Sequence, residues 1–428
     1  MVTRSARYIL QVRRSLLLKV LSIGLSFYSV RINIQYLGVE QYGVWAVIFS
    51  IMTLLVFFDF GVSNGLKNKV SESLIRSDYS SARTYIASAY VFSLGLFFTL
   101  ISIFYVFCGY FDWTILFDSI HTDQELDIVF LVAASFVLLN FILMVVHQVI
   151  NAVQKSSITV FSQLLTLILM VLSVSLLSLY SEGKLIYISV AYGLSIVTSN
   201  FVITVYFYKG HRELIPKLGR IERDKFLSLC ELGGKFFLLQ IFALVISLTD
   251  RILVSKFVGV SEVSIYDVLY KYFSILIVFH TLINAPLWSI YSEAYGRKDY
   301  LWIRSMVSKF GVLFCAYFTA VLFMSIFGPL VVKYWIGEGL GDISRIDILF
   351  IGIMALFYMA YTSLAMLSNG INYTYPQMLL GGIGALLNIP MSAYLSSFLG
   401  MKGIVLASII SYSFFVFGGP ITLMKKLK

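Results

Sequence analysis

The chain has 428 residues, of which 59% are hydrophobic and only 13% are charged, and its mean hydropathy is +0.89. Soluble domains carry about 25% charged residues, so this composition excludes an ordinary soluble protein and indicates an integral membrane protein. The net charge of +10 would also suit a protein that binds nucleic acid. However, most basic residues lie between the apolar segments, where membrane topology explains them, so no nucleic-acid partner is expected.

Twelve apolar segments are long enough to cross a bilayer as helices, which takes about 20 residues each. The first follows Arg4, Arg7, Arg13 and Arg14, as the apolar part of a signal peptide would. It is too long for that role and no small-residue cleavage site follows, so we expect it to be retained. The segments are also too long and too uniformly apolar for a membrane barrel. The expected helices are 15–36, 41–63, 84–109, 125–149, 157–180, 185–208, 233–255, 264–287, 309–331, 346–368, 376–398 and 402–424.

The basic residues between these segments predict the orientation of the chain. With the N-terminus in the cytoplasm, 22 of the 32 Lys and Arg residues fall in cytoplasmic connections, five in outer connections and five inside the segments. Connections rich in Lys and Arg stay in the cytoplasm, so both termini are expected there. The same basic connections would contact anionic membrane lipid.

The two halves of the sequence resemble each other at an offset of 221 residues. Residues 71–83 read SESLIRSDYSSAR and residues 292–304 read SEAYGRKDYLWIR, with six identical positions of thirteen. Because both copies fall on the cytoplasmic side, the halves share one orientation and are related by an axis along the membrane normal. We therefore expect an all-α membrane protein with two six-helix lobes, 1–208 and 233–428. The connecting segment 209–232 is either an interfacial amphipathic helix or a plain cytoplasmic loop.

Eight charged side chains lie inside the apolar segments, and all fall in the first, second, seventh and eighth. A charge near the bilayer centre costs roughly 2.5–3.5 kcal/mol, so eight facing lipid would cost on the order of 20 kcal/mol. The repeat pairs the first segment with the seventh and the second with the eighth. We therefore expect these four helices to line a water-filled cavity between the lobes. The eight residues are Lys19, Arg31, Asp59, Lys235, Asp250, Arg251, Asp267 and Lys271.

These charges sum to a positive value, with five cations against three anions, which favours an anionic substrate. A guanidinium binds two phosphate oxygens at once, so Arg31 and Arg251 are the candidate contacts for a phosphate headgroup. Lys19 and Lys235 can instead extend to the cytoplasmic interface. The expected cavity also contains Lys19, Lys271, Asp250 and Asp267.

The same charges have a structural alternative. Asp267 and Lys271 are four residues apart on a helix and can pair. Asp250 and Arg251 are adjacent, so they point about 100° apart and need different partners. A salt bridge that joins the seventh and eighth helices would use some of these charges without any contact to substrate.

Two titratable residues occupy equivalent positions of the repeat, because the offset pairs Asp59 with His280. A histidine near a carboxylate can change charge in the physiological pH range, so this pair is a candidate for proton coupling. The alternative is that Asp59 bonds within a bend of its own helix and His280 is a satisfied polar residue. The four histidines and three cysteines show no metal-ligand spacing, so no metal and no cofactor are expected.

Two stretches of this sequence resemble a known family. YLGVEQYGVWAVIFSIMTLLVFFDFGVSNGLKN (36–68) is similar to the start of bacterial polysaccharide-export flippases of the O-antigen type. TDRILVSKFVGVSEVSIYDVLYK (249–271), followed by NAP (284–286), is similar to their seventh and eighth helices. These flippases belong to the multidrug/oligosaccharidyl-lipid/polysaccharide exporter superfamily. In helix number, length and half-repeat the resemblance covers the whole chain.

The resemblance implies a cavity lined by the first, second, seventh and eighth helices. It implies a substrate of undecaprenyl-diphosphate carrying a short oligosaccharide, moved from the cytoplasmic to the periplasmic leaflet of a bacterial inner membrane. Transport would proceed by alternating access, coupled to protons or to the membrane potential. A polysaccharide polymerase and a chain-length regulator are the implied protein partners. A diphosphate-linked sugar is anionic and cannot cross hydrocarbon unaided, which agrees with a cationic cavity.

Four other classes fit the sequence less well. A cation-coupled multidrug exporter of the same superfamily should have a net acidic cavity. Flippases for the peptidoglycan lipid precursor commonly carry more than twelve helices. A major-facilitator transporter should have a glycine-and-basic motif where residues 64–76 read NGLKNKVSESLIR. A membrane-embedded glycosyltransferase or polymerase should have a large outer loop with catalytic residues. The predicted outer connections of this sequence contain no such loop, so we expect a transporter and not an enzyme.

Overall fold

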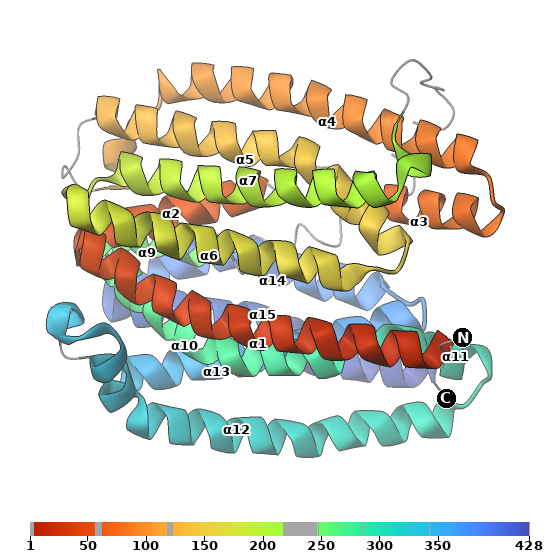
Figure 1. Cartoon of the computed structure of the whole chain (residues 1–428). Helices are drawn as coiled ribbons and strands as arrows, with labels where there is room; N and C mark the ends of the chain where they lie inside the picture. The colour runs from red at the N-terminus through yellow and green to blue at the C-terminus, as the bar shows by residue number, and fades with distance from the viewer. Residues whose placement is uncertain are drawn as a thin grey trace. The chain divides into compact units, whose positions relative to one another are not determined.

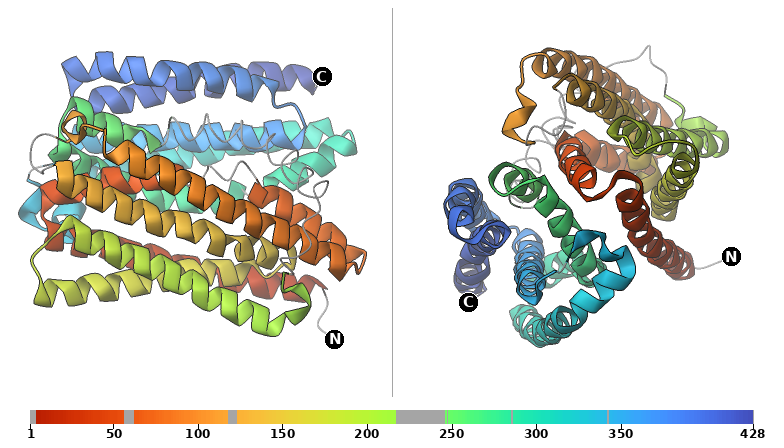
Figure 2. Two further views of the ribbon diagram at one scale, coloured as in Figure 1. Left: turned by 90° about the horizontal axis from the view of Figure 1, so that it is seen from above. Right: turned by 90° about the vertical axis from the view of Figure 1, so that its left-hand side faces the viewer.

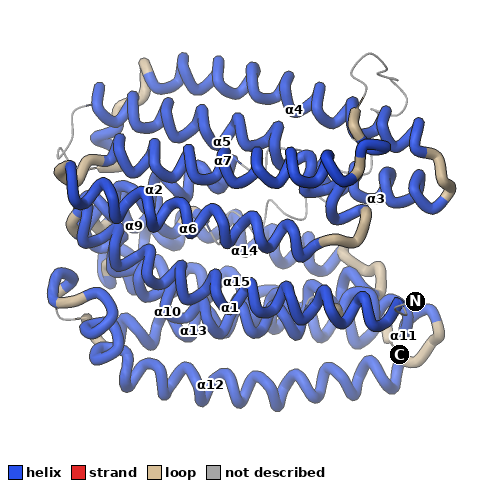
Figure 3. The backbone as a smooth tube through the Cα atoms, viewed as in Figure 1, coloured by secondary structure: helices blue, strands red, loops and turns tan. Residues whose placement is uncertain are grey.

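Helices make up the regular structure of this chain. In a computed structural model, the described residues are 4–55, 62–117, 123–216, 246, 248–284, 286–341 and 343–427, and none of them lies in a strand (Figure 3). The predicted fold class, an all-α membrane protein, is confirmed. Two of the predicted intramembrane charges, Asp59 and Lys235, lie outside the described residues.

Ten described helices are long and apolar enough to cross a membrane, and each overlaps one predicted segment (Figure 1). A helix satisfies its backbone hydrogen bonds internally, which is what the bilayer requires of a spanning segment. The ten helices are α1 (Arg4–Leu37), α4 (Tyr79–Cys108), α5 (Asp123–Ala152), α6 (Ser156–Tyr180), α7 (Leu185–Gly210), α10 (Val260–Asn284), α12 (Tyr300–Ile336), α13 (Arg345–Gly370), α14 (Tyr375–Leu399) and α15 (Met401–Lys426).

The second and seventh predicted segments are described only in part. The second begins as the apolar helix α2 (Val39–Leu55), and the described end of the seventh is α9 (Asp250–Phe257). A short helix follows the second predicted segment, and another follows the eighth: α3 (Val62–Ile75) and α11 (Leu287–Gly296). Three 3₁₀ turns are also described: η2 (Trp113–Ile115), η3 (Arg212–Leu214) and η4 (Glu338–Leu340).

The chain divides into two compact units, each described here by itself. Unit 1 is Met1–Gln41, Ile51–Ile115 and Ser119–Gln240, and unit 2 is Tyr42–Ser50, Leu116–Asp118 and Ile241–Lys428. Neighbouring helices run in the order α4, α5, α7, α6, α1 within unit 1 and α12, α13, α15, α14, α9 within unit 2 (Figures 1 and 2). Both orders are the third, fourth, sixth, fifth and first segments of a half, so the repeat extends to helix packing. The predicted linker 209–232 lies mostly outside the described residues, and the lobe boundaries stay a prediction.

The turn before the second helix of each half is built on a glycine. Gly38 has φ +79° and Gly259 has φ +135°, conformations that residues with a Cβ rarely adopt. The Gly38 N–H donates to the Ile34 carbonyl at 2.8 Å, and the Gly259 N–H donates to the Val254 carbonyl at 3.0 Å. Each glycine therefore ends one helix and turns the chain into the next.

The repeated motif has the same local structure in both copies. Arg76 pairs with Glu72 at 2.7 Å, and Arg297 pairs with Glu293 at 2.6 Å. The next residues, Ser77 and Lys298, have φ of 58° and 60°. Asp78 and Asp299 then accept a hydrogen bond from the backbone N–H three residues later, at 2.9 and 3.1 Å. These aspartates cap α4 and α12, which is why α12 begins at Tyr300, earlier than the apolar segment predicted at 309–331.

The last arginine of each copy reaches the end of the last helix in its own unit. Arg83 Nε donates to the Glu213 carbonyl at 2.6 Å, just after α7, and Arg304 Nη2 donates to the Leu427 carbonyl at 3.0 Å, just after α15. Leu427 is the C-cap of α15, whose last carbonyls have no partner within the helix, so Arg304 supplies one and fastens the end of α15 to α12. Glu213 lies in the turn η3, three residues beyond α7, so Arg83 fastens this turn to α4.

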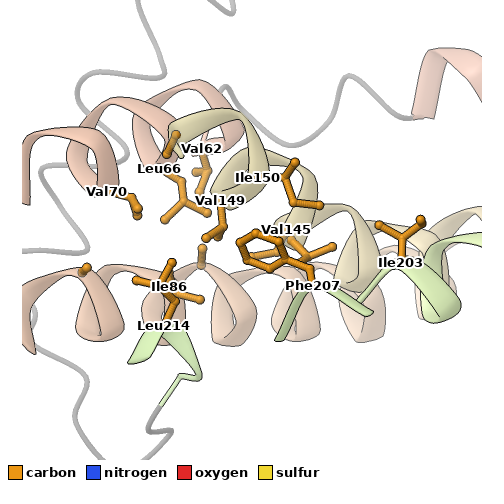
Figure 4. Close-up of a cluster of buried hydrophobic side chains, with 14 residues drawn as sticks. Val62, Leu66, Val70, Ile86, Val145, Val149, Ile150, Ile203, Phe207 and Leu214 are labelled. Carbon is orange, nitrogen blue, oxygen red and sulfur yellow. The ribbon is translucent and has the colours of Figure 1, made fainter. Parts of the chain in front are cut away.

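Figure 4 shows a cluster of buried apolar side chains in unit 1. One of its members, Leu214, follows Glu213, whose carbonyl accepts the hydrogen bond from Arg83. The cluster joins α3, α4, α5, α7 and η3. Burial of each such side chain stabilises the fold by roughly 1.5–3 kcal/mol. Its largest contributions come from Leu66, Ile86, Ile150, Phe207 and Leu214, all nearly inaccessible to solvent.

We expect Arg83→Gln to loosen the end of α7, because hydrogen bonds from a charged donor contribute about 1.5–3 kcal/mol. The site is on the surface, so the opening free energy of residues 211–215 should fall by about 1 kcal/mol. Hydrogen exchange of these amides should quicken about fivefold. Arg76→Gln is the control, since its exposed pair with Glu72 is worth about 0.3–0.5 kcal/mol. Equal exchange at residues 211–215 in the two variants would contradict the role given to Arg83.

Candidate functional site

The seventh and eighth segments are joined by a salt bridge in unit 2. Arg251 of α9 contacts the Asp267 Oδ1 of α10 through Nε at 2.7 Å and through Nη2 at 2.6 Å. The Tyr42 hydroxyl of α2 donates to the other oxygen, Oδ2, at 2.6 Å. The Arg251 side chain is 13% exposed and that of Asp267 is 16% exposed. Two buried charges with bonds to both carboxylate oxygens form a well-satisfied pair.

Aromatic rings complete the surroundings of Arg251. Its guanidinium carbon lies 5.1 Å from the centre of the Tyr270 ring and 5.7 Å from that of Tyr266. Both distances are within the range of a cation–π interaction. Tyr266 and Tyr270 are four residues apart on α10, so they present their rings on one face of that helix.

Asp250, beside Arg251 in sequence, belongs to a separate hydrogen-bond network. It is 1% exposed. Tyr266 Oη donates to its Oδ2 at 2.8 Å, and Ser408 Oγ of α15 donates to its Oδ1 at 2.8 Å. Asn388 Nδ2 of α14 in turn donates to Ser408 Oγ at 3.1 Å. A cavity of ≈ 10 Å³ adjoins Asp250, which is about the space that one water requires.

The structure decides between two partners that the sequence left open for Asp267. Arg251 bonds to its Oδ1 atom and Tyr42 donates to its Oδ2 atom. Lys271 and Asp267, both described, do not form a salt bridge. Lys271, one turn further along α10, is partly buried. The salt bridge between the seventh and eighth helices, expected as the structural alternative, is thus present. The different partners of Asp250 and Arg251 follow from their 100° separation on the helix.

The two cations of α1 lie in unit 1. Arg31 is exposed and Lys19 is partly buried, and neither has an acidic partner within 4 Å among the residues that the structure describes. They are twelve residues apart, so about 18 Å of helix separates them. Lys19 lies five residues after Arg14, where the apolar part of α1 begins, and its extension to the interface stays a prediction.

His280 of α10 is 1% exposed. Its Nε2 atom lies 3.1 Å from Ser363 Oγ and 3.4 Å from Thr362 Oγ1, both on α13. Rings of Phe310, Phe314 and Tyr317 surround the imidazole. Because Asp59 lies outside the described residues, the coupling of these two residues stays a prediction.

A buried polar cluster in unit 1 was missed by the sequence reasoning. Asn200 Oδ1 accepts from Ser162 Oγ at 2.6 Å and lies 2.9 Å from His147 Nε2, and Asn200 Nδ2 contacts Asn140 Oδ1. Ser199 Oγ donates to the Ser162 backbone carbonyl at 2.7 Å. These side chains join α5, α6 and α7 and are uncharged, so a search for formal charges in apolar segments passed over them. Asn and His inside an apolar segment would have been the signal.

Among the described residues, no three or more His, Cys, Asp and Glu side chains gather in a group that could hold a metal ion. The contacts of α9 and α10 are made by paired charges, hydroxyls and aromatic rings, the chemistry of a polar path or of a helix contact.

Comparison with known proteins gives related sequences along the whole chain. The sequence profile of the family described as "Polysaccharide biosynthesis protein" matches residues 14–291. A "Putative O-antigen transporter" of Salmonella typhimurium is 24% identical over 421 residues, which are 96% of this chain and 95% of that protein. A "Putative O-antigen export protein" of Yersinia pseudotuberculosis is 23% identical and covers 72% of this chain and 70% of its own length.

Solved structures share the fold. An inward-facing multidrug resistance MATE family transporter of the MOP superfamily has a TM-score of 0.74 at 13% identity, covering 95% of this chain and 94% of that one. The lipid II flippase MurJ in an inward closed conformation has a TM-score of 0.68 at 15% identity, covering 96% and 87%. At these identities the similarity shows the fold alone.

Proposed function

The chain belongs to the polysaccharide biosynthesis protein family, and from this premise we propose that it is a flippase for a lipid-linked oligosaccharide. Its cargo is an undecaprenyl-diphosphate carrying a short oligosaccharide, moved from the cytoplasmic to the periplasmic leaflet of the inner membrane. The observation that carries this proposal is the similarity to an O-antigen transporter over 96% of the chain. It is a transporter rather than an enzyme, and alternating access moves the cargo.

The intramembrane charges support an anionic cargo. Among the described residues these charges comprise four cations and two anions: Lys19, Arg31, Arg251 and Lys271, against Asp250 and Asp267. A positive surplus in a low-dielectric environment attracts a diphosphate and opposes a cationic drug. This surplus favours the flippase over the alternative, a cation-coupled multidrug exporter of the same superfamily.

Arg31 and Arg251 are the proposed headgroup contacts. Arg31 is exposed and has no acidic partner among the described residues. Arg251 has five N–H donors, and Asp267 occupies those of Nε and Nη2, so donors remain for phosphate. Lys271 adds a further cation one turn from Asp267. Asp59 and His280 are the proposed coupling pair, and both termini lie in the cytoplasm because the basic connections do.

The test is export of surface glycan by a bacterium that lacks this gene and carries the Arg31→Ala variant. A lost charge-assisted hydrogen bond of about 1.5–3 kcal/mol lowers the rate about tenfold or more. The same fall is expected in vesicles that contain the purified protein and the lipid-linked oligosaccharide. Arg31→Lys should retain part of the rate, since it keeps the charge but not the planar fork.

Arg345→Ala is the matched control, because this exposed arginine at the start of α13 carries no proposed role. Export by Arg31→Ala at the rate of the control would refute the headgroup contact. Efflux of a cationic dye, in the absence of glycan export, would favour the multidrug exporter instead.

A further inference from the structure

A groove of ≈ 580 Å³ opens on unit 1 between α1, α6 and α7. Its walls include Leu17, Phe161 and Val202, which are 67%, 42% and 47% exposed. All three lie in helices that are long and apolar enough to cross a membrane. Phe161 of α6 and Val202 of α7 belong to helices outside the four that are expected to line the cavity, so their exposed apolar side chains face hydrocarbon. The groove is therefore open to lipid on that side.

One end of this groove is polar. Arg14 lies there at the start of the apolar part of α1, and Ser157 lies in the first turn of α6. None of the described residues that line the groove is acidic. The arginine and the hydroxyl therefore form an end that is complementary to an anion, next to walls that are complementary to a hydrocarbon chain.

The start of α6 adds to this complementarity. Its N-cap residue, Lys155, makes no side-chain capping hydrogen bond, and its first turn contains no acidic residue. The first N–H groups of a helix carry partial positive charge and favour an anion. The charge of Arg14 and the start of α6 therefore both favour an anion at this end of the groove.

We propose that this groove binds one anionic phospholipid. The phosphate lies against Arg14 and Ser157, and an acyl chain lies along Leu17, Phe161 and Val202. The polar end is on the side where α1 begins, where the basic connections lie, and anionic phospholipid accumulates at such a surface. The site lies within one unit and does not depend on the cargo proposed above. It makes the phospholipid a bound component of this unit.

Native mass spectrometry of the purified full chain in detergent tests this site, with phosphatidylglycerol or phosphatidylcholine added. We expect one phosphatidylglycerol to bind at least fivefold more tightly than phosphatidylcholine, since an arginine at the membrane surface is worth about 1 kcal/mol. Arg14→Gln should remove this preference. Lys309→Gln, which changes an exposed lysine of α12 outside the groove, should preserve it.

A second pair of variants tests the apolar wall. Val202→Trp fills the groove from an exposed position and should abolish the bound phosphatidylglycerol. Phe201→Trp is its control, because Phe201 is 57% exposed and does not line the groove. Equal binding of the two lipids, or equal effects of Arg14→Gln and Lys309→Gln, would overturn the proposal. Displacement of phosphatidylglycerol by equimolar undecaprenyl-diphosphate would also overturn it, because the groove would then hold the cargo.

Discussion

Replacing Arg251 with alanine is expected to destabilise the protein by about 3–5 kcal/mol, the cost of leaving a buried charge without its partner. Among the described residues, the variant leaves the Asp267 carboxylate with the Tyr42 hydroxyl as its side-chain hydrogen-bond donor, in a site where the Asp267 side chain is 16% exposed. Arg251 also lies against the rings of Tyr266 and Tyr270, so packing is lost with the charge. The free energy of unfolding in mixed micelles measures the effect independently of export.

Two further variants separate the ion pair from general damage to the fold. Arg251→Met combined with Asp267→Leu removes both charges and should cost less than Arg251→Ala, because no unpaired charge is left. Lys402→Ala removes a more exposed pair with Asp347, at 3.4 Å, and should cost about 0.2–1 kcal/mol. If Arg251→Ala costs no more than Lys402→Ala, the salt bridge does not hold α9 to α10.

Replacing Gly384 with alanine is expected to destabilise unit 2 by about 1–3 kcal/mol through overpacking. A Cβ at this position would fall within 3 Å of the Ser411 backbone carbonyl oxygen, so α14 and α15 would have to separate. Asn388, one turn along α14, donates to Ser408 and Ser411. The separation would therefore also weaken the bond from Ser408 to Asp250. Thermal unfolding in detergent measures the loss.

Gly311→Ala is the matched control for this substitution. Gly311 lies inside α12, and a Cβ there would meet no atom within 4 Å. Alanine is favoured over glycine in a helix interior by roughly 0.8–1 kcal/mol, so this variant should be as stable as the parent or more stable. If both glycine variants have the same stability, close contact between α14 and α15 is not what Gly384 provides.

Hydropathy predicted the membrane helices because the bilayer imposes one local rule, a long apolar run with its backbone bonds satisfied. The repeat was also visible in the sequence, because its local structure depends on residues close together in the chain. Asp78 and Asp299, for example, cap their helices through bonds to residues three positions away. The early start of α12 was missed because a cap, not hydropathy, sets it. The cluster around Asn200 was missed because its members carry no charge, and their meeting depends on how three helices pack.

The amino-acid sequence by itself determined which segments cross the membrane, where the repeat lies and which helices carry charge. Each of these follows from residues close together in the chain. Only the tertiary structure decided which charges pair. Asp267 lies one turn from Lys271, yet it bonds to Arg251 of α9 and Tyr42 of α2, because helix packing brings those donors within hydrogen-bond distance. A helix's own sequence specifies its faces, but its neighbours determine what each face contacts.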